Sequence, residues 1–101
     1  MTATHGRTVR LTGMVAAVRL PPHGQSPRFE VDLVTRALRP DRIAAGGDRI
    51  RLVWIGQRGV PGIDAGRWLT VEGFLAEHRG LPTVYNPRYE LLAGEPHEHR
   101  T

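Results

Sequence analysis

The sequence predicts a single all-β domain, in which five antiparallel strands form a small, partly open barrel with little helix. Apolar and polar residues alternate through most of the chain, and clusters of Gly and Pro separate the alternating runs. The connections between these runs are short or rich in Pro and Gly, which disfavours long helices. A chain of 101 residues is of the size of one domain.

The alternating runs predict strands at Arg7–Leu20, Arg28–Arg36, Asp48–Gly56, Arg67–Glu77 and Leu81–Leu92. The first is long and has Gly13 near its centre. This suits a strand that bends to serve two sheets, because Gly relieves crowding at such a corner. The last is interrupted at Pro87, which lacks the N–H that a ladder needs. The domain is therefore expected to span residues 7–92, with flexible tails at 1–6 and 93–101.

The connections are expected to be loops. Pro21–Pro27 is a loop on composition, and Ala37–Gly47 is better explained as an exposed loop than as a helical turn. Gln57–Gly66 is too short and too rich in Pro and Gly for a helix. We expect it to be a turn whose Val60 and Ile63 cover the end of the barrel.

Alternation also predicts which side chains face the core. In the third strand Ile50, Leu52 and Trp54 share one phase, which we expect to point inward. Arg49, Arg51 and Val53 then point outward. Phe29 in the second strand is likewise in phase with the core, and we expect packing roles for Phe29, Trp54 and Tyr89.

The charge of the chain is positive and unevenly distributed. All fourteen basic residues are Arg, ten residues are acidic, and the formal charge is +4. Residues 1–60 hold ten Arg and four acids (+6), and residues 61–101 hold four Arg and six acids (−2). Codon bias in a GC-rich genome would explain the choice of Arg over Lys, and so would the planar, bidentate contacts that Arg makes with phosphate, so the choice alone does not indicate a function. The uneven distribution is expected of a surface that attracts a polyanion.

Several function classes are excluded or disfavoured. The absence of Cys excludes disulfides and thiolate metal sites, and the absence of Lys excludes a Lys-bearing phosphate loop. His97, Glu98 and His99 fall in a polar tail, where a metal site is not expected. Glu30 and Asp32 share a strand face without further carboxylates and suggest a solvated surface, not a nuclease centre. We expect no enzyme activity and no cofactor. With no apolar run of membrane length and no signal peptide, we expect a cytoplasmic protein.

Three segments in the second half of the chain carry a family resemblance. They are Leu52-Val53-Trp54, then Gly66-Arg67-Trp68-Leu69-Thr70-Val71-Glu72-Gly73, then Pro87-Arg88-Tyr89-Glu90. This order resembles the OB-fold family, including the wedge domain of RecG-type branch-migration helicases, and is closer to free-standing bacterial OB proteins of the actinobacterial type. The resemblance covers roughly residues 8–92 and implies a nucleic-acid-binding barrel with its ligand face on the second and third strands. The helicase motifs are absent, so any wedge function would be supplied in trans.

The candidate nucleic-acid-binding residues are Arg49, Arg51, Arg28, Arg36, Arg19, Arg39, Trp68 and Phe74. The Arg residues project from the third strand or flank the loops beside it. Trp68 and Phe74 fall on the polar phase of the fourth strand. Exposed aromatics there either stack on bases, cover the barrel end or form a self-association surface.

These observations predict a non-enzymatic module that binds single-stranded or forked DNA, or RNA, with little sequence preference. Phosphate attraction by Arg and stacking on aromatics would provide the affinity. The alternative is a protein–protein interaction module or an accessory subunit of a DNA repair or recombination complex, because OB barrels use the same face to hold proteins. An exposed strand edge and outer aromatics also make a homodimer plausible.

Overall fold

The computed structural model describes residues 6–35, 48–78 and 80–95 of the chain. The strands are β1 (Gly6–Arg19), β2 (Arg28–Thr35), β3 (Asp48–Ile55), β4 (Trp68–His78), β5 (Leu81–Tyr85) and β6 (Arg88–Leu91). The described residues include no helix, so the prediction of an all-β barrel is confirmed. The first four strands begin and end within one residue of the predicted bounds, and the predicted fifth strand is replaced by β5 and β6. Gly6, expected in the leader, instead begins β1 opposite Ala76.

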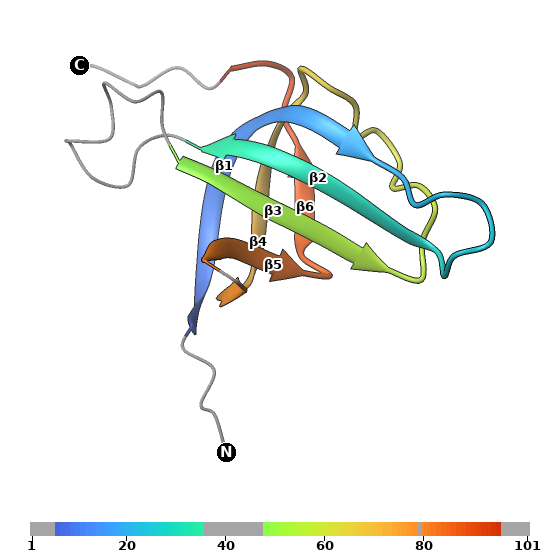
Figure 1. The fold of residues 1–101 in the computed structure, drawn as a ribbon. Coiled ribbons are helices and arrows are strands. Elements are labelled where there is room, and N and C mark those ends of the chain that lie inside the picture. Colours follow the sequence, from blue (N-terminus) through green and yellow to red (C-terminus); the bar gives the residue numbers. More distant parts are fainter. Residues whose placement is uncertain (1–5, 36–47, 79, 96–101) are drawn as a thin grey trace, which may run out of the picture.

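Five strands close on themselves in the order β1-β2-β3-β5-β4, and β1 also pairs with β4 (Figure 1). A closed barrel of this kind is consistent with an OB-like fold. The prediction that all strands are antiparallel is wrong in one place, because β3 and β5 are parallel. The connection 56–67 carries the chain across the end of the barrel, and the β4–β5 hairpin then returns it beside β3 in the same direction.

The long first strand serves both halves of the barrel, as predicted. Residues 6–14 pair with β4 and residues 13–19 with β2, so the two pairings overlap at Gly13 and Met14. A Cβ atom on Gly13 would lie 2.5 Å from the carbonyl oxygen of Val34, so only Gly permits this approach. The register then shifts between Val15 and Ala17, and Arg19 pairs with Glu30. Alternation from Val15 alone would turn Arg19 inward, but this bulge brings it to the outer face.

The core occupies the barrel interior. Its most completely buried side chains are Leu33, Ile50, Leu52, Leu69, Val15, Val31, Val71 and Val84. Phe29 and Trp54 pack with this cluster, as predicted, and Val60 and Ile63 from the connection 56–67 are buried at its end. Val53 points to the outer side of β3, as predicted, but solvent scarcely reaches it. Its side chain is buried because Glu30 and Tyr85 lie beside it on the neighbouring strands.

The predicted fifth strand is divided at Asn86 and Pro87 into β5 and β6. Leu75 pairs with Val84 and Glu72 with Arg88, so the chain holds one extra residue between these pairs. Asn86 has φ = 50°, and its Oδ1 accepts a hydrogen bond from the Ile55 N–H at 2.9 Å. The Pro87 carbonyl accepts a hydrogen bond from Trp54 Nε1 at 3.1 Å. The bulge therefore fastens β5 and β6 to the end of β3.

The packing role expected for Tyr89 is also confirmed. Its ring meets Trp54 edge-on, with centroids 5.8 Å apart. Its hydroxyl donates to the Pro61 carbonyl at 3.0 Å, which ties β6 to the connection that covers the barrel end.

Candidate nucleic-acid interface

The register of three strands arranges the candidate site in rows on the outer face of the barrel. Asp32 of β2 lies opposite Arg51 of β3, and Arg51 lies opposite Thr83 of β5. One row further along β3, Val53 is flanked by Glu30 and Tyr85. Paired residues on neighbouring strands point to the same side of a sheet. On the outer face, the ion pair of Asp32 and Arg51 therefore lies next to the apolar side chain of Val53.

A groove of about 550 Å³ runs between these rows. It is lined by Arg28, Glu30, Arg51, Val53, Ile55, Leu81, Thr83 and Tyr85. The loops after β1 and β3 meet at the Ile55 end of the groove, where the Gly56 N–H donates to the Pro27 carbonyl at 2.9 Å (Figure 1).

Three of the predicted arginines on this face are paired with carboxylates. Arg19 contacts both oxygens of Asp32, at 2.8 Å and 2.7 Å, and Arg51 Nε lies 3.4 Å from Asp32 Oδ1. Arg28 Nε lies 2.8 Å from Glu30 Oε2. The Asp32 and Glu30 side chains are only 14% and 15% exposed, so they are not the freely solvated surface that we expected.

Arg49 differs from the other three. It is exposed on β3 opposite Val34, and no ion pair joins it to another described residue. With Arg19, Arg28 and Arg51 it gives the face four positive charges against the two of Glu30 and Asp32. Among the described residues the face therefore keeps a balance of +2.

The other predicted site residues do not join this cluster. Arg36 and Arg39 lie outside the described residues. Phe74 is 49% exposed, but its ring lies against Gly6 at the start of β1. Trp68 is partly buried opposite Met14 of β1, six residues and roughly 20 Å from Phe74 along β4. Neither aromatic lines the groove beside the arginines.

The structure brings two apolar residues to the groove that the sequence did not single out. Tyr85 is 48% exposed and Ile55 is 54% exposed. Ile55 continues the outward phase of Arg49 and Arg51, so that signal was present in the sequence. The position of Tyr85 could have been predicted from the apolar Val84 beside it, since neighbours on a strand face opposite sides. The interruption at Pro87, however, left the alternation of the predicted strand Leu81–Leu92 ambiguous.

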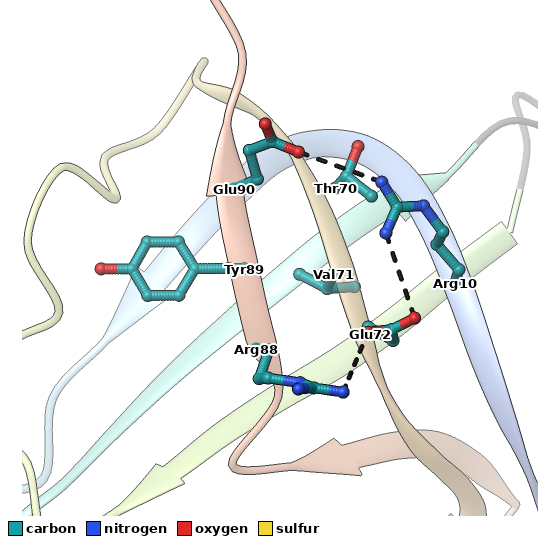
Figure 2. Close-up of a pocket in the computed structure, with 7 residues that line it drawn as sticks. All are labelled: Arg10, Thr70, Val71, Glu72, Arg88, Tyr89 and Glu90. Carbon is teal, nitrogen blue, oxygen red and sulfur yellow. Dashed lines mark hydrogen bonds and ion pairs between the residues drawn. The ribbon is translucent and has the colours of Figure 1, made fainter.

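A second charged surface, on β1, β4 and β6, is electrically balanced (Figure 2). Arg10 lies 4.0 Å from Glu72 and 3.9 Å from Glu90, and Arg88 lies 3.2 Å from Glu72. These side chains are 38–86% exposed and surround a hollow of about 180 Å³. Two arginines and two glutamates cancel here, so this surface has no net charge, whereas the β2–β3 face has a balance of +2.

Comparisons with known proteins add no family. No protein-family model, no curated protein and no solved structure matches the chain. Among residues 6–35, 48–78 and 80–95, no cluster of three or more His, Asp or Glu side chains is placed to hold a metal ion. The same residues contain no helix that is long and apolar enough to cross a membrane.

Proposed function

We propose that this chain is a non-enzymatic module that binds single-stranded or forked DNA, or RNA, with little sequence preference. The observation that carries the proposal is the concentration of Arg19, Arg28, Arg49 and Arg51 on the outer face of β2, β3 and the end of β1. The resemblance to free-standing bacterial OB proteins agrees with this function.

Phosphate contacts provide the affinity in this mechanism. Arg49 offers a guanidinium that no ion pair joins to another described residue. Arg28 and Arg51 each contact a carboxylate through Nε, and an Arg has further N–H donors for a phosphate oxygen. The carboxylates also limit the motion of the arginine side chains. Phosphate contacts carry no base information, so binding is weakly selective for sequence.

The test is a titration of labelled single-stranded DNA, RNA and forked duplex at several salt concentrations. Log affinity should fall linearly with log salt, with a slope of about −0.7 for each phosphate contacted on a single strand. The double variant Arg49→Ala, Arg51→Ala removes two contacts, so the slope should become shallower by about 1.4. All sequences should be weakened alike.

The matched control is Arg10→Ala, Arg88→Ala, which removes the same charge from the balanced surface in Figure 2. Both double variants lower the net charge of the protein equally. If only the net charge mattered, both would lose the same affinity for nucleic acid. The proposal requires the Arg49, Arg51 variant to lose much more affinity. Equal losses, or an unchanged slope in a folded Arg49, Arg51 variant, would refute the assignment of this face.

A protein–protein interaction module or accessory subunit is the second candidate. The exposed Ile55 and Tyr85 and the ion pairs of Glu30 and Asp32 favour it, because aromatic and apolar side chains within a charged rim are typical of protein interfaces. Failure of the parent protein to bind any nucleic acid at low salt would select this candidate. Sedimentation of the free protein would then show whether the partner is a second copy of the chain.

A further inference from the structure

We infer that the groove between β3 and β5 receives an unpaired nucleobase, with Tyr85 as the stacking residue, and that the module thereby distinguishes a single strand from a duplex. This inference rests on the proposed function and names the part of a nucleic acid that the groove takes. It moves the stacking role from Trp68 and Phe74 to a residue of β5.

The groove has the composition of a site for a flat, partly apolar group. Its floor is Val53, which is only 4% exposed although it belongs to the outer face. Tyr85 lies directly beside Val53 on β5, and Ile55 lies two residues further along β3. About half of each of these two side chains remains exposed to solvent. Solvent-exposed apolar walls above a buried apolar floor are stabilised when a ring covers them.

The charged rim decides in favour of a nucleotide over a purely apolar ligand. Arg28 lies opposite Ile55, and Arg51 lies one row from Val53, so guanidinium groups lie on the rim of the apolar floor. A base placed on Tyr85 would have its sugar and phosphate within reach of these groups. Glu30 also lines the groove, and a carboxylate can accept hydrogen bonds from base amino groups.

A duplex cannot use this groove in the same way. Paired bases are stacked on both faces and present only their edges, so Tyr85 has no base face to contact unless a base is unpaired. A duplex would still meet the arginines through its phosphates. The arginines therefore contribute affinity for both forms, and Tyr85 contributes affinity for the single strand alone.

The experiment compares a single-stranded oligonucleotide with the duplex of the same sequence, using the parent and the variants Tyr85→Ala, Tyr85→Phe and Phe74→Ala. Stacking contributes about 1–3 kcal/mol per base, so Tyr85→Ala should weaken single-strand binding by roughly 5- to 150-fold. Duplex binding should change less than about twofold on the same grounds, since Tyr85 makes no duplex contact. Tyr85→Phe should keep the parent's affinity, because stacking does not need the hydroxyl. The salt slope should stay unchanged in all three variants, because no phosphate contact is lost.

The outcomes separate this inference from the proposed function. If the parent binds with the expected salt slope but Tyr85→Ala binds the single strand normally, the inference is wrong and the function stands. Equal losses for single strand and duplex, or a loss in Phe74→Ala in place of Tyr85→Ala, would also overturn it. Absence of any binding by the parent overturns both. Circular dichroism of each variant shows whether the barrel is still folded.

Discussion

Gly73 lies where β4 passes the bulge between β5 and β6, and its missing side chain is needed there. A Cβ atom on Gly73 would lie 2.7 Å from Val84 Cγ1, and 3.5 Å from Pro87 Cα. Val84 is fully buried and has short, stiff branches, so it cannot move aside easily. We predict that Gly73→Ala destabilises the barrel and that Val84→Ala relieves this specific collision.

The magnitudes follow from these contacts. Overpacking by one methyl in a dense core costs about 1–3 kcal/mol, and replacing Gly within a strand returns about 0.5–1 kcal/mol. Gly73→Ala should therefore lower the free energy of unfolding by about 1–2 kcal/mol. Val84→Ala removes two buried methyl groups and should cost about 2–3 kcal/mol. In the double variant the new methyl occupies part of the vacated space. We expect the double variant to lose about 2 kcal/mol of unfolding free energy, whereas the sum of the two single losses would be about 4 kcal/mol.

Urea unfolding followed by tryptophan fluorescence measures all four proteins of this cycle. Gly59→Ala serves as the control, because a Cβ there would meet no atom within 4 Å. That control should be neutral or more stable by up to about 1 kcal/mol. If the two losses simply add to within about 0.5 kcal/mol, Gly73 and Val84 are not in the contact described, and the reasoning fails.

Three further predictions concern the ion pairs and the bulge. Asp32→Asn removes the carboxylate shared by two arginines. Because this removes one negative charge from the face, it should strengthen single-strand binding by roughly fivefold at low salt, equivalent to about 1 kcal/mol for a partly exposed pair. Weaker binding in the titration would contradict this and would show that the carboxylate matters more for holding the two arginines in place. Asn86→Ala loses both the hydrogen bond to the Ile55 N–H and a residue suited to φ = 50°, and should cost about 2 kcal/mol in urea unfolding. Asn86→Gly loses only the hydrogen bond and should cost about half of that, so equal costs would remove the backbone argument. Arg88→Ala breaks an ion pair whose Arg is 86% exposed, so it should lower the free energy of unfolding, measured in urea, by less than about 1 kcal/mol. A larger loss would show that the ion pairs in Figure 2 stabilise the fold more than solvent-exposed pairs do.

The sequence by itself determined the strands and, in the uninterrupted strand β3, the side that faces the core. Ile50, Leu52 and Trp54 are buried as their alternation predicts, and Arg49 and Arg51 are on the outer side. This much is local information, because successive side chains of a strand point to opposite faces wherever the strand is placed. The role of Gly13 was also predicted from the sequence, since a Gly in the middle of a long strand indicates a bend or a close approach of backbone.

The composition of the candidate site was decided only by the tertiary structure. A bulge after Val15 turns Arg19 toward Asp32, and the parallel pairing of β3 with β5 places Tyr85 beside Val53. Both depend on strand register between segments far apart in the chain. A shift of one residue exchanges the two faces of a strand, and alternation within one strand carries no information on such shifts. The sequence therefore predicted a positively charged face, and strand register decided which arginines are paired and which aromatic lies among them.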